Sequence, residues 1–381
     1  MEYCKKCVMP NTTEASNFKN GLCPGCQAQK SKKAVNWNKK HKELDKIMDN
    51  AKKSAGNNYD CIVPISGGKD SVYQLHIVYK EYGLKPLAVT FNHGGFTQTG
   101  MYNLLNALDK FNIDHIMFTL NNDLIKRIQK RSIETIGDYC WHCHNMVNSF
   151  TLQMACQYRI PLIVWGESGA EYGHQGADYN NIVRFDKDYF TKLSSKLTPE
   201  EFACEYISIR DLYPCNVPND TFLDLIIGIH LGNYIPWDTE SQVKMIKEVY
   251  GWRGREVGGS YKDYKSIECS FEPMHEYLCL LKRGYGRTSL QASQEVRDGI
   301  ITKNEAKTLV DHYERIKPKH LVYYLKRIGM LPQQMTCIVN KMRHKNMDAN
   351  WINGKEWREC NEDGKPWAER FLEDMAHDQR D

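Results

Sequence analysis

The sequence lacks a strong excess of charge of either sign. Its 381 residues carry 51 Lys and Arg against 47 Asp and Glu, which gives a formal net charge of +4. So small a surplus of positive charge excludes a strongly basic nucleic-acid-binding domain or a polybasic membrane tether as the principal feature of the protein.

Long hydrophobic runs and a secretion signal are also missing. No apolar stretch approaches the roughly 20 residues needed to span a bilayer. The first residues, MEYCKKCVMP, contain no apolar core of the kind a signal peptide needs. We therefore expect a cytoplasmic protein with no membrane partner.

Cysteine, in contrast, is plentiful. Fourteen cysteines in so long a chain do not make a secreted disulfide scaffold, so we interpret them as reduced thiols, some of which bind metal. Hydrophobic residues make up 41% of the chain and aromatic residues 11%, which is enough for a sizeable core.

Short apolar runs bounded by turn residues alternate with helical stretches through the first two thirds of the chain. Strands are predicted at 59–65, 86–91, 114–118, 161–165 and, after a region without clear alternation at 170–232, at 233–236. Helices are predicted between them at 71–83, 99–111, 122–134 and 144–158. Such alternation indicates an α/β fold with a doubly wound parallel sheet covered by helices on both faces.

The remaining segments are mostly helical. A solvated helix is predicted at 35–55, before the sheet. Helices after the sheet are predicted at 271–283, 289–298, 302–315, 317–329 and 332–345, with a short one near 366–376. We divide the chain into an N-terminal zinc ribbon at 1–30, the α/β domain at 31–255 and a helical C-terminal region at 256–381.

The sharpest local signal is the hexamer Ser66-Gly67-Gly68-Lys69-Asp70-Ser71, between a buried strand and a helix. Two glycines let the backbone approach a ligand closely, and successive N–H groups at a helix N-terminus form an anion site. Lys69 adds a charge, and Ser66 and Ser71 add hydroxyl groups. In a doubly wound sheet this turn is where nucleotide phosphates bind.

Two cysteine pairs stand close to the start of the chain. Cys4 and Cys7 are separated from Cys23 and Cys26 by 15 residues. Two CxxC pairs with such a gap fit a closed tetrahedral zinc site, and a segment this short has no other means of building a core.

A second cluster, 138–144 (DYCWHCH), leaves three interpretations open. In the first it is a substrate-pocket loop, with Trp141 as a stacking wall and His142 or His144 as a proton carrier. In the second, Cys140 and Cys143 bind a metal or an iron–sulfur cluster with a third ligand such as Cys269. In the third the residues only pack.

One more pair of pocket residues, of which Glu167 is the polar one, is suggested by the strand at 161–165. Gly166 and Glu167 follow this strand directly. The carboxyl ends of parallel strands are where α/β proteins bind their substrates, so we expect both residues at the substrate site.

SGGKDS resembles the PP-loop of the ATP pyrophosphatase superfamily. The resemblance implies that 66–71 hold the pyrophosphate of ATP, that Lys69 and Asp70 serve catalysis, and that Asp70 helps to position Mg²⁺. It also implies that Phe91 and Asn92, at the end of the second strand, lie near the adenosine.

A wider pattern resembles one family, the N-acetyl sugar amidotransferases of bacterial surface-polysaccharide synthesis, including lipopolysaccharide and O-antigen. The matching motifs lie at Tyr3 to Pro10, Cys23 to Cys26, Asp60 to Ser71, Pro86 to Asn92, Cys140 to His144 and Ile160 to Glu167, with further likeness at 250–253, 277–287, 292–293 and 300–306. The resemblance spans most of the chain, apart from 170–232 and the last 30 residues.

This family resemblance implies a reaction and partners. ATP activates the acetamido group of a nucleotide-linked sugar as an adenylate, and ammonia converts it to an acetamidino group. The ammonia would come from partner subunits similar to the glutaminase and cyclase of the histidine pathway. Candidates for binding the sugar nucleotide's phosphates are Arg253, Lys262, Arg283 and Arg287, because arginine suits bidentate phosphate contacts.

The alternative function is that of a tRNA-modifying PP-loop enzyme such as a thiolase. Zinc ribbons and internal CxxC pairs occur there too, and Cys140 and Cys143 would then carry sulfur or ligate a cluster. The small net charge speaks mildly against a nucleic-acid partner.

Overall fold

The computed structural model describes residues 1–13, 18–171, 179, 196–314, 316–347, 358–359 and 366. At its centre, five strands form a parallel sheet in the order β3-β2-β1-β4-β5. The strands are β1 (Cys61–Pro64), β2 (Pro86–Asn92), β3 (His115–Thr119), β4 (Leu162–Trp165) and β5 (Ile227–His230). Strand order reverses between β1 and β4, which creates the switch point where α/β proteins bind ligands.

Alternate residues of each strand face two different helical layers, as the period of a strand requires. Val63 of β1 belongs to one core cluster, and its neighbour Ile62 belongs to the other. The first layer contains α2 (Trp37–Ala55), α3 (Lys69–Leu75), α4 (Gln98–Phe111) and α8 (Thr239–Tyr250). The second contains α5 (Asn122–Ile136) and α6 (Trp141–Tyr158). The predicted doubly wound α/β class is therefore confirmed.

Short elements connect the main helices and strands in the described part of the chain. The α3 helix continues as a π-helical stretch at His76–Glu81. Single turns of 3₁₀-helix lie at Gly169–Glu171, Tyr213–Cys215, Thr221–Leu225 and Leu231–Asn233, and α7 is a short helix at Pro199–Phe202.

The position predicted for the fifth strand is wrong. The strand lies at Ile227–His230, and the predicted segment 233–236 follows it as a turn and loop. A strand at the sheet edge has one neighbour, and Ile227 remains exposed, so the apolar pattern here is weak. Asn233 lies in the loop instead, where its side chain accepts a hydrogen bond from Ser168.

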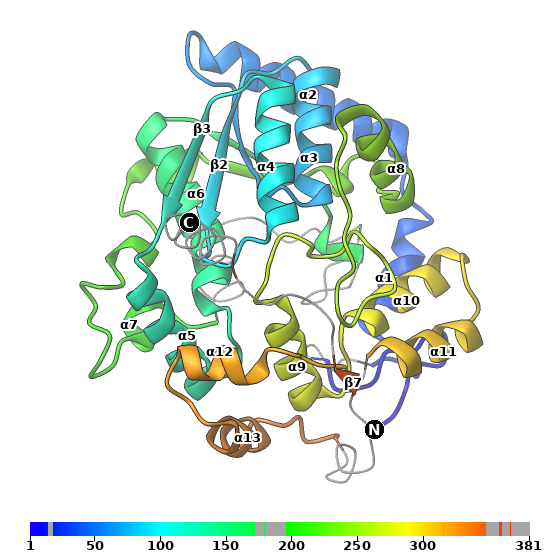
Figure 1. Ribbon diagram of the computed structural model, residues 1–381. Coiled ribbons are helices and arrows are strands. Elements are labelled where there is room, and N and C mark those ends of the chain that lie inside the picture. The colour runs from blue at the N-terminus through cyan, green and yellow to red at the C-terminus, as the bar shows by residue number, and fades with distance from the viewer. Residues whose placement is uncertain are drawn as a thin grey trace, which may run out of the picture.

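The C-terminal helices pack below the carboxyl ends of the strands (Figure 1). They are α9 (Glu272–Arg283), α10 (Arg287–Asp298), α11 (Lys303–Tyr313), α12 (Leu321–Arg327) and α13 (Pro332–Lys341), and a small parallel pair joins β6 (Ile316–Lys317) to β7 (Arg358–Glu359). Their core cluster includes Ile133 of α5 and Cys140, which tie these helices to the second helical layer.

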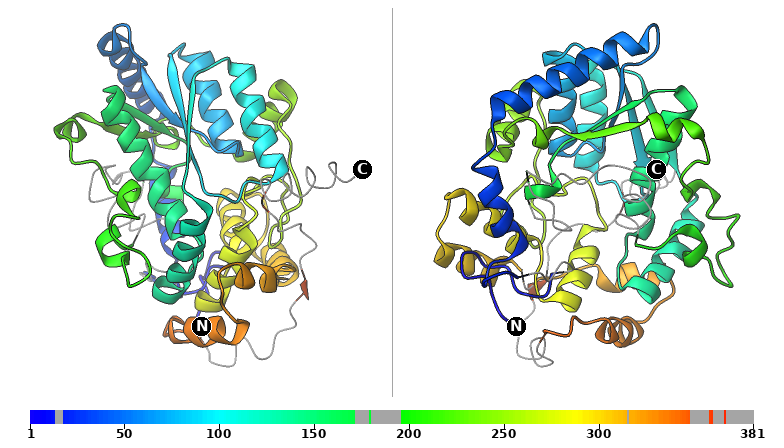
Figure 2. Two further views of the ribbon diagram at one scale, coloured as in Figure 1. Left: turned by 60° about the vertical axis from the view of Figure 1, so that its left-hand side comes forward. Right: turned by 180° about the vertical axis from the view of Figure 1, so that it is seen from behind.

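The N-terminal segment lies beside the C-terminal helices, far away in sequence. Figures 1 and 2 show α1 (Pro24–Lys32) next to α10 in views from both sides. Gln29 donates a hydrogen bond to the carbonyl of Arg297, 3.3 Å away. Lys303 donates to the carbonyl of Cys4 at 2.6 Å.

Two sequence predictions are not tested by the structure. The helix near 366–376 falls on residues that, except for 366, lie outside the described part of the chain. The boundaries of the three parts, at 30 and 255, stay a prediction. Among the described helices, none combines the length and the apolar character needed to cross a membrane.

Candidate functional site

The hexamer 66–71 forms the turn from β1 into α3. Gly67 has φ of 75°, in the left-handed region where a side chain is strained. A Cβ at this position would meet the carbonyl oxygen of Gly100 at 2.5 Å. The indole Nε1 of Trp252 donates to the carbonyl oxygen of Gly67 at 2.9 Å, which fixes the turn from the other side.

The two serines of the loop hold its shape. Ser66 Oγ accepts a hydrogen bond from the backbone N–H of Gly68 at 3.3 Å. Ser71 Oγ accepts from the N–H of Ser66 at 3.3 Å and donates to the carbonyl of Gly68 at 2.9 Å. The loop is therefore organised by its own side chains, which leaves its glycine backbone close to the helix N-terminus where anions bind.

Lys69 and Asp70 form a buried ion pair beside the loop. The ammonium of Lys69 lies 2.5 Å from Asp70 Oδ1. Burial disfavours the charge of Lys69, but Asp70 and Glu167 raise its pKa. Burial likewise opposes the charge of Asp70, and the ammonium of Lys69 outweighs it and lowers the pKa of Asp70. Both groups are charged at neutral pH.

A cavity of about 490 Å³ opens at this loop. From the loop it is lined by Ser66, Gly68, Lys69, Asp70 and Ser71, and from the strand ends by Phe91 and Glu167. The opposite wall comes from the segment 264–287, before and within α9 and at the start of α10. The cavity thus lies between the sheet and the C-terminal helices.

The segment 264–287 adds charged groups that the sequence analysis did not single out. Burial raises the pKa of Glu268, and burial followed by the charge of Lys69 lowers the pKa of Lys265. Asp70, Glu167, Glu268 and Glu272 give the cavity four carboxyl groups. Oxygen donors of this kind are what Mg²⁺ prefers, so the chemistry of these groups suits that ion.

The cluster 138–144 contributes to the cavity in part. Cys140, Cys143 and His144 line it, and Cys269 lines it from the facing segment. Their helix, α6, begins at Trp141, three residues earlier than predicted, so most of the cluster lies on a helix.

The prediction that Trp141 forms a stacking wall is corrected. Its ring is buried in the second helical layer, 3.8 Å from the ring of Phe202 and nearly parallel to it. Its Nε1 donates to the carbonyl of Leu197 at 3.1 Å. A tryptophan with both its face and its N–H engaged inside the core offers no surface to a substrate.

The histidines of the cluster differ in position. His142 is buried outside the cavity lining, and its Nε2 lies 3.1 Å from the carbonyl of His93. His144 lines the cavity, and burial lowers its pKa to about 4. Of the two predicted proton carriers, only His144 is placed to reach a ligand, and it is neutral at physiological pH.

A histidine that the sequence analysis missed stands next to them. His275 of α9 lines the cavity, and its Nδ1 lies 2.7 Å from Asp138 Oδ1. Burial opposes its charge, but Asp138 raises the pKa of His275. Glu272 and His275 stand three residues apart on a predicted helix, and this spacing is the signal that could have marked them as one face.

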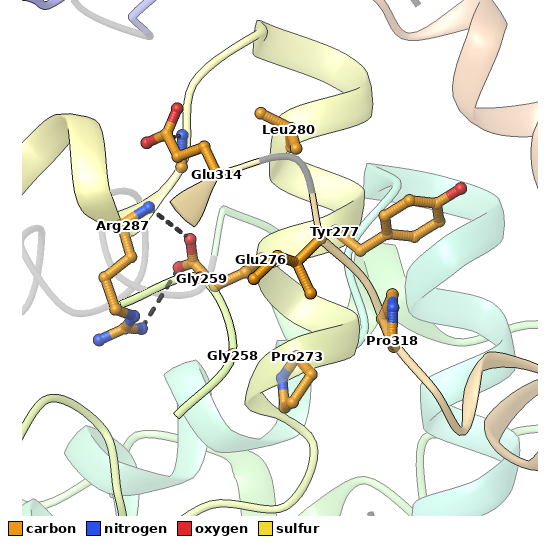
Figure 3. A pocket seen from close by; sticks show the side chains of 11 residues that line it. Gly258, Gly259, Pro273, Glu276, Tyr277, Leu280, Arg287, Glu314 and Pro318 are labelled. Carbon is orange, nitrogen blue, oxygen red and sulfur yellow. Dashed lines mark hydrogen bonds and ion pairs between the residues drawn. The ribbon is translucent and has the colours of Figure 1, made fainter. Parts of the chain in front are cut away.

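Arg287 lines the cavity, but its guanidinium already has protein partners. Nη1 donates to Ser266 Oγ at 2.7 Å, and Nη2 contacts the carboxylates of Glu272 and Glu276. Figure 3 shows Arg287 and Glu276 joined in this way at the start of α10. These contacts support a role for Arg287 in positioning Ser266, Glu272 and Glu276 more directly than a role in binding phosphate.

The other predicted phosphate contacts are placed elsewhere. Arg253 lies over the ring of Tyr102, 3.6 Å from its centroid, outside the lining of the cavity. Lys262 pairs with Glu240 and, at 3.4 Å, with Glu295. Arg283, at the end of α9, is likewise outside the cavity lining. These three residues lie outside the lining of this cavity, and their contact with the substrate stays a prediction.

Two predicted residues border the site without lining the cavity. Gly166 packs against Asp70, since a Cβ there would lie 3.2 Å from that of Asp70. The side chain of Asn92 accepts a hydrogen bond from the N–H of Gly94 at 3.0 Å and shapes the turn after β2.

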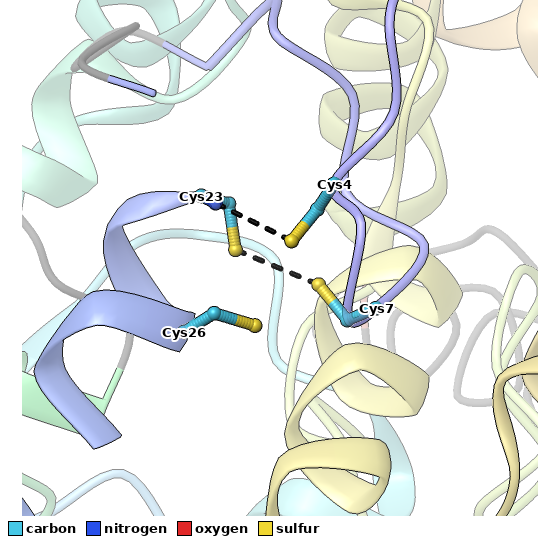
Figure 4. A group of neighbouring side chains, drawn as sticks. All are labelled: Cys4, Cys7, Cys23 and Cys26. Atoms are coloured by element: carbon cyan, nitrogen blue, oxygen red, sulfur yellow. Dashed lines mark hydrogen bonds between the residues drawn. The ribbon is translucent and has the colours of Figure 1, made fainter. Parts of the chain in front are cut away.

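The four N-terminal cysteines converge as predicted (Figure 4). The sulfur atoms of Cys4, Cys7, Cys23 and Cys26 all lie within 4.8 Å of one another, and the four side chains are buried. The sulfurs of Cys7 and Cys23 are 3.5 Å apart. Four convergent thiols are the donor set of a closed structural zinc site, so these residues fit zinc.

Two sequence comparisons relate this chain to known proteins. Residues 258–361 match a family model, which describes the C-terminal domain of WbpG-like LPS biosynthesis proteins. An uncharacterised protein of Methanocaldococcus jannaschii, MJ1599, is 32% identical over 238 residues, which cover 61% of this chain and 81% of that protein.

A solved structure of NMN synthetase from Francisella tularensis aligns with 61% of this chain and 92% of its own, with 13% identity and a TM-score of 0.30. The family rests on the sequence matches and on the PP-loop. The chain belongs to the WbpG-like family of LPS biosynthesis proteins.

Proposed function

We propose that this protein is an ATP-dependent amidotransferase of surface-polysaccharide biosynthesis, which converts the acetamido group of a nucleotide-linked sugar to an acetamidino group. One observation carries the proposal. The phosphate loop and the segment 264–287 line the same cavity, and that segment lies within the WbpG-like match. This shared cavity supports a reaction between ATP, held at the loop as we propose, and a substrate bound by the WbpG-like part of the chain.

The chemistry follows from the poor leaving ability of an amide oxygen. That oxygen attacks the α-phosphorus of ATP, pyrophosphate leaves, and an imidate adenylate is formed. Ammonia then adds to the imidate carbon, and AMP departs with the former amide oxygen. The enzyme's task is to align the reactants and to stabilise the charge that develops on phosphate.

The cavity residues suit this task. Lys69 and the N–H groups at the start of α3 would hold the departing pyrophosphate. Asp70, Glu167 and Glu268 would hold Mg²⁺, which neutralises phosphate charge when it is bound. We further propose that ammonia is delivered by glutaminase and cyclase-like partner subunits, because free ammonia is scarce at neutral pH.

The test combines purified protein, ATP, an N-acetylated nucleotide sugar and ammonium chloride, with AMP and pyrophosphate as readout. We expect their formation to depend on the sugar. Lys69→Ala should reduce the rate by at least about 100-fold, since it removes a preorganised charge from the phosphate site. Lys80→Ala is the matched control, because this lysine is exposed further along the same helical segment, and it should keep full activity.

A different substrate requirement would contradict the proposal. Pyrophosphate release that requires tRNA and a sulfur donor, and ignores the sugar, would replace this proposal with the thiolase alternative.

A further inference from the structure

Three histidines of the described chain line the cavity in different surroundings: His93, His144 and His275. Burial lowers the pKa of His93 to about 3 and that of His144 to about 4. Neither of these rings therefore takes up a proton near neutral pH. His275 is different, because its Nδ1 lies 2.7 Å from the carboxylate oxygen Oδ1 of Asp138. This pair can accept a proton where the other two histidines cannot.

Asp138 holds the ring of His275 from a fixed position. Its Oδ1 also accepts hydrogen bonds from the backbone N–H groups of Tyr139 at 2.6 Å and Cys140 at 3.1 Å. Asp138 is buried, and of the two partners only His275 lines the cavity. A carboxylate held in this way selects the tautomer that carries its hydrogen on Nδ1, and it stabilises the imidazolium when that forms.

The second ring nitrogen of His275, Nε2, is available to a ligand. Among the described residues no hydrogen bond or ion pair involves this atom, and the side chain is 22% exposed. With the hydrogen on Nδ1, the lone pair of the neutral ring is on Nε2. A lone pair that can reach a reacting group, with a carboxylate behind the ring, is the arrangement of a general base.

The charge of His275 responds to groups on two elements. These are Glu276 and Lys282 on its own helix, α9, and Asp138, Cys140 and His144 on and before α6. Burial opposes the charge, but Asp138 outweighs burial and raises the pKa of His275, with a further increase from Glu276. Lys282 acts in the opposite direction. Cys140 and His144 stay neutral, because burial raises the pKa of the thiol and lowers that of the imidazole.

We propose that His275, held by Asp138, is the general base that takes a proton from ammonia as ammonia adds to the adenylated substrate. This inference rests on the proposed function and assigns a residue to its second step. The phosphate loop serves the adenylation step, and His275 serves the addition of ammonia from the facing wall of the same cavity. The two steps therefore use different residues and can be separated by experiment.

The proton balance of this step shows why a base is needed. The nitrogen of ammonia forms a bond to the imidate carbon, whose own nitrogen keeps its hydrogen. The incoming nitrogen then carries one hydrogen more than the product needs, and Nε2 of His275 takes it as a proton. The C–O bond to AMP breaks, AMP leaves with the electron pair of that bond, and the amidinium product remains. The imidazolium gives its proton to water before the next turnover.

The experiment measures the two steps separately with the whole chain. Sugar-dependent exchange of label between pyrophosphate and ATP, without ammonia, reports adenylation. AMP formation with ammonium chloride reports the complete reaction. His275→Gln keeps a side chain that can donate a hydrogen bond to Asp138 but has no basic nitrogen. We expect this variant to keep the exchange rate of the wild type, which also reports that it folds, and to lose AMP formation by about 100-fold or more.

A second readout is the pH dependence of AMP formation, with rates expressed per concentration of free ammonia. In the wild type this rate should fall as pH decreases through the pKa of His275, because the imidazolium cannot accept a proton. Asp138→Asn keeps an acceptor oxygen for the N–H groups of Tyr139 and Cys140 but does not stabilise the imidazolium, so the fall should move to lower pH. Added imidazole should restore part of the AMP formation of His275→Ala. A purely structural role predicts neither effect.

The matched control is His312→Ala, at an exposed histidine in the last turn of α11, which should keep both activities. The inference is overturned if His275→Gln forms AMP at the wild-type rate, or if it loses exchange and AMP formation equally. A second zinc per chain that this variant removes would overturn it too, because an imidazole bound to a metal cannot accept the proton. If the wild type shows no sugar-dependent exchange, the proposed function itself fails, and this inference fails with it.

Discussion

At the scale of single residues, Gly67 decides the shape of the phosphate loop. We predict that Gly67→Ala destabilises the protein by about 2–3 kcal/mol. The left-handed backbone alone costs an alanine about 1–2 kcal/mol. The added Cβ would also meet backbone atoms of Gly100 and Leu104 at 2.5 and 2.7 Å, and these cannot move as a flexible side chain can.

The matched control is Gly251→Ala. Gly251 also has a positive φ, of 67°, but nothing lies within 4 Å of its Cβ position. It should therefore show the backbone cost without the contact cost. Urea unfolding of both variants measures the difference, and equal losses of stability would mean that the loop has room for a side chain.

The residues of the loop could be predicted from sequence because they are contiguous. Strand, hexamer and helix follow one another, so local rules place all six residues together. Arg253 and Trp141 could not be placed in this way. Whether they reach the cavity depends on contacts with Tyr102 and Phe202, which come from other segments. Glu268 and Lys265 lie in a stretch without periodicity, so no pattern marked them.

At the scale of elements, the start of α10 depends on a buried carboxyl group. Glu314 accepts hydrogen bonds from the backbone N–H groups of Gly286 and Ser289 and from the Ser289 hydroxyl (Figure 3 shows its place). Burial raises the pKa of Glu314 to about 7, although these hydrogen bonds favour the charged form.

We predict that this group makes the protein less stable as pH rises. In the unfolded chain the carboxyl titrates near its ordinary value of 4.5, whereas in the native state it keeps its proton until about pH 7. The native state therefore binds more protons between these values, so stability falls as pH increases through the window. From about pH 5 to about pH 8 the loss should be on the order of 2–3 kcal/mol.

Glu314→Gln should remove this pH dependence, because the amide does not ionise. Urea unfolding at both pH values measures it. The control is Glu305→Gln, at the start of α11, where an exposed glutamate caps the helix through Thr302. Hydrogen bonds from Thr302 lower the pKa of Glu305, so its effect appears only in more acidic solution. A wild-type profile that runs parallel to that of Glu314→Gln would contradict the assignment.

Elements were predictable where the hydrophobic pattern was strong. The apolar runs of β1, β2 and β4 are largely buried on both faces, and β3 is half-buried. Each of these four strands was predicted within two residues of its observed bounds. The fifth strand has a glycine and an exposed isoleucine at the sheet edge, so its pattern is no stronger than that of the loop after it. The start of α6 was predicted too late because its N-cap residue, Cys140, is not one of the usual capping residues and makes no side-chain capping hydrogen bond.

At the scale of the whole molecule, the parts of the chain are joined around the cavity rather than arranged in a row. The N-terminal cysteine group packs with Tyr285, just before α10, and with Leu290 and Val296 in that helix. Arg297 in turn donates a hydrogen bond to the carbonyl of Glu171, after β4. No local sequence pattern predicts contacts between residues so far apart in the chain. The predicted division into three parts therefore could not show how these parts are arranged in space.

This arrangement predicts that loss of the N-terminal metal destabilises the whole molecule. Cys26→Ser should lose about one zinc per chain, since a closed structural site needs all four ligands. Zinc binding contributes directly to folding free energy. The contacts of Lys303 with Cys4 and of Arg297 with Gly25 pass the effect on to α10 and α11. We therefore expect a single unfolding transition, shifted to lower urea concentration by several tenths of a molar unit or more.

Cys337→Ser serves as the control, because Cys337 is exposed on α13 and should change neither metal content nor unfolding. Zinc analysis, urea unfolding followed by fluorescence, and limited proteolysis of the first 33 residues together separate the outcomes. If the N-terminal segment became sensitive to protease while the main transition stayed unchanged, the metal would stabilise only its own segment. If the main transition shifts together with zinc loss, the cysteine group supports the wall of the cavity. The structural reason is that the helix against which this group packs, α10, begins with Arg287, and Arg287 lines that cavity.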